Sequence, residues 1–324
     1  MQNVDELDLR LAHALQVDGR ASFTRIATVL GVSDQTVARR YGRLRSSGAL
    51  RVVGLTDPDI TGDTQWYVRV KATPDAAQPI ARALARRSDT TWVMLVAGGT
   101  EIICTVRSGS ADRGDDLLLS ALPRTSRVLE VQASCRLHQY FGGQRGAVEK
   151  LDLLRPDQVA ALLNGRVVPR PPHRPVVVDP VDRGILDELA LDGRCSLDQL
   201  ATSTSTPAAT VRRRLEALRD RGVLFFDVEL DNRLLDRNVE AVLWLKVEPA
   251  ALHGAGTALG AHPEVAFAAA CTGPAALLAY VVTPDPAALY VYLTRSVAAL
   301  PGVREVESAP VIRLLKGAGA RPAT

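Results

Sequence analysis

The sequence has few of the residues that mark disulfide-bonded, metal-binding or membrane-spanning proteins. Its four cysteines, Cys104, Cys135, Cys195 and Cys271, stand singly, with no C-x-x-C pair and no histidine at a metal-ligand spacing. No run approaches the roughly 18 apolar residues of a membrane span, and the first ten residues lack the basic start and apolar run of an export signal. The sequence therefore predicts reduced, mostly buried thiols in a cytoplasmic protein, with no metal and no membrane.

Catalytic signatures are missing as well. The chain has no nucleophile elbow, no phosphate-binding loop and no cluster of metal ligands. We therefore expect no catalytic residue and no cofactor. The net charge is only +3, but the stretch from Ser33 to Arg51 has five Arg against one Asp, and such a local basic face is typical of a surface that binds nucleic acid.

The chain contains an internal duplication. The segment that begins at Val4 returns 174 residues later at Val178, and 18 of the 47 aligned pairs are identical, where composition alone would give roughly three. Each copy opens with a compact, Arg-rich helical unit and continues with a segment of strand signals. Two copies of one module are therefore predicted.

Each copy opens with three predicted helices. In the first copy, Asp5, Ser22 and Ser33 are placed to cap them, and Gly31 supplies the tight turn before the third helix. The buried face of that third helix is expected to be Val37, Tyr41 and Leu44. Three helices with a short glycine turn before the third predict a helix-turn-helix, followed by a short strand.

The second copy keeps the same frame with a weaker turn. Ser205 replaces the turn glycine, and Thr206 followed by Pro207 is expected to start the third helix. We expect this unit to fold, but with lower stability than the first.

After each helical unit the pattern predicts strand, helix, strand, strand, helix and strand. This βαββαβ order is that of a ferredoxin-like domain, in which helices cover one face of an antiparallel sheet. The two open sheet faces are expected to pack on each other. The predicted fold class is α+β, with two winged-type helix-turn-helix domains (residues 1–54 and 178–228) alternating with two ferredoxin-like domains (64–140 and 238–317). Residues 141–177 form a linker with a short helix over Pro156–Leu163 and a stiff PRPPHRP spacer.

These motifs resemble those of the Lrp/AsnC transcriptional regulators. The resemblance lies in DGR-x-S, in the third helix SDQTVARRYGRL, in the terminal G-x-L and in the βαββαβ segment that follows, and both halves of the chain carry it. It implies a DNA-binding helix-turn-helix, a sheet domain that dimerises and binds small effectors such as amino acids, and assembly into dimers or larger rings. Because the usual member has one copy of each domain, the chain resembles two fused subunits forming an internal pseudo-dimer.

The third helix of each copy carries the candidate DNA-binding residues. Its outward side should enter the major groove, where Arg pairs with guanine, Gln with adenine and Thr with the thymine methyl group. Arg20 and Arg45 are expected to hold phosphates, whereas Arg40 lies beside the buried stripe and is as well placed to brace the domain. The second copy has lost the Gln and one Arg, which predicts fewer base-specific contacts. The candidate residues are Ser33, Gln35, Thr36, Arg39, Arg43, Arg45 and Arg20 in the first copy, and Thr206, Thr210, Arg212, Arg213 and Arg214 in the second.

The effector site implied by the resemblance lies at the turn between the second and third strands, where family members carry T-G-x-x-D. The first copy offers Gly98 and Glu101, and the second offers Thr272 and Gly273 with Ala276 at the acidic position. A carboxylate there could receive the ammonium group of an amino acid, so the second site is expected to be impaired. The alternative is that the glycines only serve a hairpin turn and that Glu101 is a solvated strand end.

Two other functions remain open. Siroheme decarboxylases resemble the same two-domain architecture, but their sheet domains carry H-N-Y-x-R and N-x-W-F motifs, and the corresponding strands here contain neither His nor Arg. The five histidines, at positions 13, 138, 173, 253 and 262, lie elsewhere, and we expect His138 and His173 to be solvated or structural. A scaffold that only assembles with other regulators would suit the weaker second turn, but not the intact first recognition helix.

Overall fold

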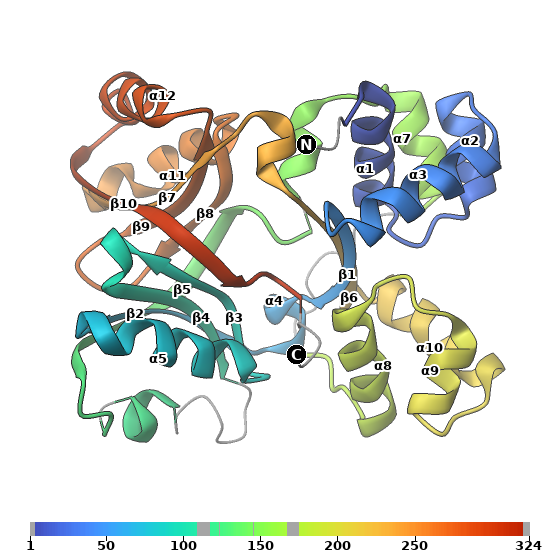
Figure 1. Cartoon of the computed structure of the whole chain (residues 1–324), viewed down its shortest axis with the longest axis horizontal. Coiled ribbons are helices and arrows are strands. Elements are labelled where there is room, and N and C mark those ends of the chain that lie inside the picture. Colours follow the sequence, from blue (N-terminus) through green and yellow to red (C-terminus); the bar gives the residue numbers. More distant parts are fainter. Residues whose placement is uncertain (1–3, 109–116, 123, 145, 167–174, 320–324) are drawn as a thin grey trace. The chain divides into compact units, whose positions relative to one another are not determined.

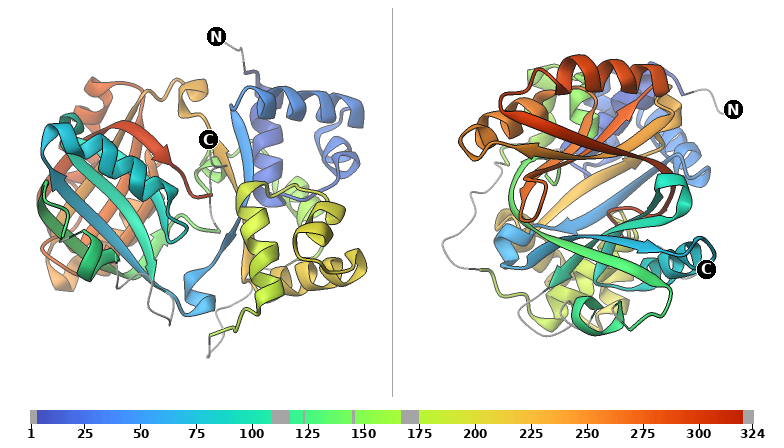
Figure 2. Two further views of the ribbon diagram at one scale, coloured as in Figure 1. Left: turned by 60° about the horizontal axis from the view of Figure 1, so that its bottom comes forward. Right: turned by 90° about the vertical axis from the view of Figure 1, so that its left-hand side faces the viewer.

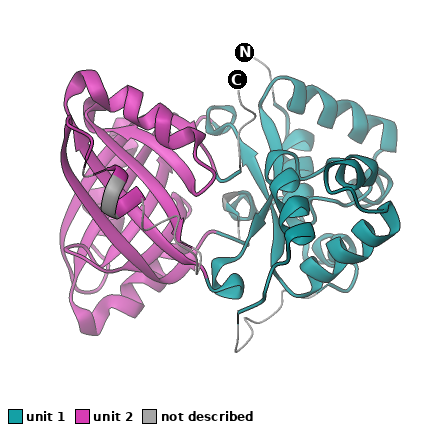
Figure 3. Cartoon of the chain, turned by 90° about the horizontal axis from the view of Figure 1, so that it is seen from below, with its two compact units in different colours: residues 1–62, 143–235, 318–322 teal, residues 63–142, 236–317, 323–324 magenta. Residues whose placement is uncertain are grey.

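The computed structural model describes residues 4–108, 117–122, 124–144, 146–166 and 175–319. The chain forms two compact units (Figure 3), one of residues 1–62, 143–235 and 318–322, and one of residues 63–142, 236–317 and 323–324. Unit 1 contains the helix-turn-helix part of both sequence copies, and unit 2 contains both ferredoxin-like parts. The α+β fold class is thereby confirmed.

The first helix-turn-helix comprises α1 (Glu6–Val17), α2 (Phe23–Leu30) and α3 (Asp34–Ser46), followed by β1 (Leu50–Thr56) and the short α4 (Pro58–Thr61) (Figure 1). Side chains at Asp5, Ser22 and Ser33 accept hydrogen bonds from the first turns of α1, α2 and α3, as predicted. Gly31 ends α2 in the left-handed conformation at φ 71°. The buried face of α3 is the predicted one.

The second helix-turn-helix comprises α8 (Pro180–Leu191), α9 (Leu197–Ser203) and α10 (Ala208–Asp220), followed by β6 (Leu224–Leu230) and the 3-10 turn η4 (Asn232–Leu235). The third helix was expected to start at Thr206 and Pro207, and it begins at Ala208, directly after them. Pro207 takes the cap position and offers no side-chain acceptor, while the Thr206 hydroxyl donates to the Thr204 carbonyl at 3.0 Å. Ser205 adopts φ 50°, the left-handed conformation that Gly31 provides in the first copy.

The two helix-turn-helix modules of unit 1 share one core and one sheet. β1 and β6 pair antiparallel from Leu50 opposite Leu230 to Thr56 opposite Leu224, and the buried apolar residues of both modules form a single cluster. The 3-10 segment η3 (Ala147–Leu151) and helix α7 (Pro156–Leu163), which has the predicted bounds, pack on α1, and α7 also packs on α2. The predicted PRPPHRP spacer lies outside the described residues, except for Pro175.

Unit 2 contains two copies of the predicted strand order. The first copy runs through β2 (Thr64–Ala72), α5 (Pro74–Arg86), β3 (Thr90–Val96), the 3-10 turn η1 (Ala97–Gly99), β4 (Glu101–Ser108), the π-helical turn η2 (Leu117–Ala121) and β5 (Val128–Phe141). The second runs through β7 (Val239–Val247), η5 (Pro249–Ala251), α11 (Leu252–Ala261), β8 (Val265–Cys271), β9 (Leu277–Thr283), α12 (Pro286–Val291), η6 (Tyr292–Val297) and β10 (Val303–Lys316).

The two sheets of unit 2 join into one closed ring, in the order β10-β3-β4-β2-β5-β8-β9-β7. The sequence predicted two separate four-stranded sheets packed face to face. The ring closes because β5 and β10 are each 14 residues long, so each pairs first within its own copy and then, through its C-terminal part, with β8 or β3 of the other copy. The faces turned toward each other bury a shared apolar cluster, which confirms the predicted packing, and α5, α11 and α12 cover the outer faces (Figure 2).

Candidate DNA-binding and effector sites

Helix α3 presents a solvent-exposed surface opposite its buried face. With Val37, Tyr41 and Leu44 turned inward, the helical repeat places Gln35, Arg39, Gly42 and Ser46 at the centre of the opposite side; we call these four positions the outward face. All four residues are exposed. At the helix start, Ser33 Oγ accepts from the Thr36 amide at 3.1 Å and lies 2.9 Å from the Thr36 hydroxyl. The side chains best placed to contact bases are therefore Gln35 and Arg39.

Two other arginines of α3 hold the domain together. Arg40 donates to both carboxylate oxygens of Asp5, at 2.6 and 2.7 Å, and to Asp8 at 2.9 Å. Arg43 pairs with the other oxygen of Asp8, whose side chain is completely buried. The Asp5 and Asp8 carboxylates raise the pKa of Arg40, and Arg40 lowers that of Asp5. Arg43 is thus a structural residue as well as a predicted base contact.

The structure places Arg20 and Arg45 between the two modules. Arg20 donates to the carbonyls of Gly193 and Cys195, at 2.9 and 3.0 Å. Arg45 forms an ion pair with Asp192 at 2.6 Å. The prediction that Arg20 holds a phosphate is therefore corrected: its guanidinium already binds carbonyls of the other module, and burial lowers its pKa. Arg45 remains 57% exposed and open to a phosphate.

The bonds across this interface are reciprocal. Arg194, the counterpart of Arg20, donates to the carbonyls of Gly19 and Ala21 at 2.6 and 3.1 Å. Arg219, the counterpart of Arg45, pairs with Asp18 at 2.6 Å. Matching residues of the two copies thus make matching bonds, as a pseudo-twofold axis requires.

Helix α10 has the same kind of ion pairs to the first helix of its module as α3 has. Arg214, the counterpart of Arg40, pairs with Asp179 at 2.6 Å and Asp182 at 2.9 Å. Both carboxylates orient Arg214 toward α8, so this predicted DNA contact has a structural role as well. Arg212 and Arg213 are exposed, and Thr210 is half-buried.

The sequence prediction missed two carboxylates on the outward face of α10. Glu216 stands at the position of Gly42 and Asp220 at that of Ser46, on the side opposite the buried Val211, Leu215 and Leu218. Arg166, at the end of the linker helix, pairs with both. The 174-residue shift already aligned these positions, so the acidic residues could have been found by comparing the copies at each outward position.

Glu101, the carboxylate predicted to bind an effector, already forms an ion pair. Glu101 accepts from Arg69 Nε at 2.6 Å, and both side chains are more than four-fifths buried. Arg69 also forms a two-bond pair with Glu307, at 2.6 and 3.0 Å, and its guanidinium carbon lies 4.4 Å from the centroid of the Trp244 ring. Glu307 and Glu101 raise the pKa of Arg69. Glu101 is therefore neither a solvated strand end nor a free ammonium receptor.

The two turns predicted to form effector sites differ in their contacts with neighbouring strands. Gly98 lies in the left-handed region at φ 70° in the turn between β3 and β4. Thr272 follows β8 and accepts from the Cys135 amide at 2.8 Å through its hydroxyl, while its own amide donates to the Cys135 carbonyl at 2.9 Å. Gly273 has φ 104°, and a Cβ there would meet Ser134 Oγ at 2.9 Å. The second turn is thus fastened to β5 of the first copy.

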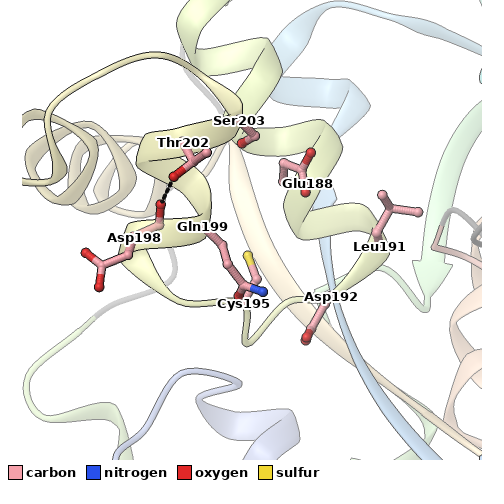
Figure 4. A pocket seen from close by; sticks show the side chains of 8 residues that line it. All are labelled: Glu188, Leu191, Asp192, Cys195, Asp198, Gln199, Thr202 and Ser203. Carbon is pink, nitrogen blue, oxygen red and sulfur yellow. Dashed lines mark hydrogen bonds between the residues drawn. The ribbon is translucent and has the colours of Figure 1, made fainter.

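A hollow of about 480 Å³ lies between α8 and α9 of the second module (Figure 4), far in sequence from the predicted effector turns. In the first module α7 packs on both equivalent helices, α1 and α2, and Gln158 donates to the Val29 carbonyl at 2.7 Å. The residues that line the open hollow are Glu188, Leu191, Asp192, Cys195, Asp198, Gln199, Thr202 and Ser203.

The described histidines occupy unrelated places. His13 is buried and accepts from the Leu153 amide at 3.3 Å, and His262 Nδ1 lies 3.0 Å from the Tyr292 hydroxyl. The rings of His138 and His253 gather around Tyr140, and His173 lies outside the described residues. Among the residues the structure describes, no three His, Cys, Asp or Glu side chains are grouped to hold a metal. In the same part of the chain, no helix is both long and apolar enough to cross a bilayer.

Three protein-family models match the chain. An AsnC-type helix-turn-helix domain matches residues 4–45, a winged helix-turn-helix DNA-binding domain matches residues 178–224, and an Lrp/AsnC ligand binding domain matches residues 240–320. The matches thus fall on both helix-turn-helix modules and on the second half of unit 2.

Curated relatives agree with these matches, and a solved structure shares the fold. The chain is 28% identical over 133 residues to an uncharacterized HTH-type transcriptional regulator of Pyrococcus furiosus, which covers 40% of this chain and 90% of the relative. It is 24% identical over 117 residues to the HTH-type transcriptional regulator FL11 of Pyrococcus horikoshii, covering 36% and 78%. The crystal structure of the siroheme decarboxylase NirDL is similar over 97% of this chain and 93% of its own, with a TM-score of 0.63 at 12% identity, which shows a shared fold only.

Proposed function

The chain belongs to the Lrp/AsnC family of helix-turn-helix transcriptional regulators, and we propose that it binds double-stranded DNA sequence-specifically as a fused pseudo-dimer. The observation that carries this proposal is that the arginines of α3 have different roles. Arg40 and Arg43 are held by Asp8, while Gln35 and Arg39 stay exposed on the outward face. Those are the residue types that pair bidentately with adenine and guanine.

The operator should have two unequal half-sites. The modules are joined by the β1–β6 pairing and by reciprocal arginine bonds, so their recognition helices belong to one body. A pseudo-twofold pair of recognition helices addresses half-sites about one helical turn apart, or a multiple of it. The two helices differ in sequence, so the operator should be an imperfect palindrome.

For regulation, we propose a small-molecule effector such as an amino acid in unit 2, near Thr272 and Gly273. The match of the ligand binding domain to residues 240–320 supports an effector in the second half of unit 2. Glu101 is a poor candidate for the ammonium receptor, because Arg69 already neutralises it. Calorimetric titration with each amino acid tests this proposal, and Gly273→Ala should weaken any binding found.

Function as a regulator further implies a cytoplasmic protein, where the chromosome is accessible, and we propose that pseudo-dimers assemble into larger homo-oligomers. Light scattering after size-exclusion chromatography tests the assembly. The shared fold with NirDL makes siroheme decarboxylation the alternative, although the strands corresponding to its motifs lack His and Arg. An absorbance change on mixing with a haem precursor would favour that alternative.

The decisive experiment is selection of bound duplexes from a random library, followed by fluorescence anisotropy at several salt concentrations. Arg39→Ala should weaken the specific complex by about 1–3 kcal/mol and relax the preference at one base pair. Arg233→Ala is the matched control, because this exposed arginine pairs with Asp231 outside both recognition helices. Equal binding of selected and random DNA would refute the proposal.

A further inference from the structure

The outward faces of the two recognition helices carry opposite charge. On α3 the four positions hold Gln35, Arg39, Gly42 and Ser46, and Arg39 is the one charged residue among them. On α10 the same positions hold Ala209, Arg213, Glu216 and Asp220. Two carboxylates thus stand where the helix meets DNA, and at a polyanion they oppose binding.

A linker residue compensates for these carboxylates. Arg166 Nη1 donates to Asp220 at 3.3 Å, and Nη2 pairs with Glu216. Arg219 lies 3.9 Å from the other oxygen of Glu216, but its main partner is Asp18 at 2.6 Å. Arg166 follows directly on α7, which packs on the first module, so the first module positions the cation that neutralises the second recognition helix.

We propose that Arg166 determines how the second module engages DNA, by neutralising Glu216 and Asp220 on the outward face of α10. This inference rests on the proposed DNA-binding function. With Arg166 in place, the carboxylates are held in ion pairs and do not contact bases, so the second half-site is tolerant of sequence. The guanidinium has five N–H donors, enough to hold both carboxylates at once.

Removal of Arg166 would change both affinity and base preference. The freed carboxylates would repel the phosphates and would accept hydrogen bonds only from an amino group in the major groove. Cytosine N4 is favoured over adenine N6, because the adenine N7 beside N6 is an acceptor that repels a carboxylate. Arg166→Ala should therefore weaken binding to the selected operator about tenfold at low salt, flatten the salt dependence by about one unit, and enrich cytosine in the second half-site.

The test is a double-mutant cycle measured by anisotropy on the full chain. Arg166→Ala is combined with Glu216→Gln and Asp220→Asn, which remove the charges while keeping side-chain size. The two neutral substitutions alone should strengthen binding about tenfold, and in their presence Arg166→Ala should change affinity by less than about twofold. Arg233→Ala again serves as the control for loss of a surface cation, and thermal melts identify any variant that is unfolded.

The outcomes separate the inference from the function on which it rests. An equal loss on Arg166→Ala with and without the carboxylates would show that Arg166 is a simple phosphate contact and would overturn the inference. Unchanged affinity of the Glu216→Gln/Asp220→Asn variant would overturn it too, even if Arg166→Ala were unfolded. Wild-type protein that binds no duplex above random DNA would overturn the proposed function as well.

Discussion

Exchange of the residues at the two helix-turn-helix turns should change stability in opposite directions. Gly31 and Ser205 occupy the same turn position in the two modules, at φ 71° and 50°. A Cβ at Gly31 would meet no atom within 4 Å, so packing makes no contribution to a substitution there. The hydrogen bonds that follow are also the same, from Val32 to Ala27 and from Thr206 to Ala201, both at 3.0 Å.

The difference between the turns is therefore one of backbone energy. A non-glycine residue in the left-handed region costs about 1–2 kcal/mol, and glycine loses about 0.5–1 kcal/mol in greater unfolded-chain entropy. Ser205→Gly should stabilise unit 1 by about 0.5–1 kcal/mol, and Gly31→Ser should destabilise it by a similar amount. For a unit of this size, 1 kcal/mol corresponds to roughly 2–4 °C in Tm.

Differential scanning calorimetry measures both variants and their combination. The double variant should return close to the wild-type Tm, because the two turns lie in different modules and their effects should add. A destabilising Ser205→Gly, or a neutral Gly31→Ser, would refute the argument that left-handed backbone strain weakens the second turn.

Three further predictions concern charges and thiols. Arg40→Ala should destabilise unit 1 by about 1.5–3 kcal/mol, because it removes a charged hydrogen-bond partner from the buried Asp8 while Arg43 keeps the other oxygen. Arg39→Ala should leave the urea midpoint unchanged, and equal effects would contradict the assigned roles. Burial raises the pKa of Asp227 to about 6, above its unfolded value, so unit 1 should lose up to about 3 kcal/mol as pH rises from about 4 to 6. Asp227→Asn should flatten that dependence, and an unchanged slope in urea titrations would exclude this carboxyl. Burial also raises the pKa of Cys104 to about 12 and the pKa of Cys195 and Cys271 to about 11. At pH 8 a thiol reagent should therefore label the half-buried Cys135 first. Mass spectrometry that shows Cys104 labelled first would contradict the packing.

Local sequence signals determined the elements of this protein. The caps at Asp5, Ser22 and Ser33, the glycine at the end of α2 and the bounds of α7 follow from hydrogen bonds within a few residues of the chain. The repeat itself predicted two modules, and the alternation of apolar residues predicted both βαββαβ segments. The order of strands along each copy and the packing of the two sheet faces therefore follow from the amino-acid sequence alone.

Contacts between residues far apart in the sequence decided how the strands pair and which arginines are exposed. The closure of the ring depends on β5 and β10 crossing to the other copy, and no local pattern specifies the partner of an edge strand. The same holds for arginine roles: Arg20, Arg39 and Arg214 look alike as sequence letters, but only the tertiary structure places carbonyls around the first, solvent around the second and two carboxylates around the third. Charge in a sequence is a property of the residue, whereas its availability to DNA depends on which partners the fold brings within hydrogen-bond distance.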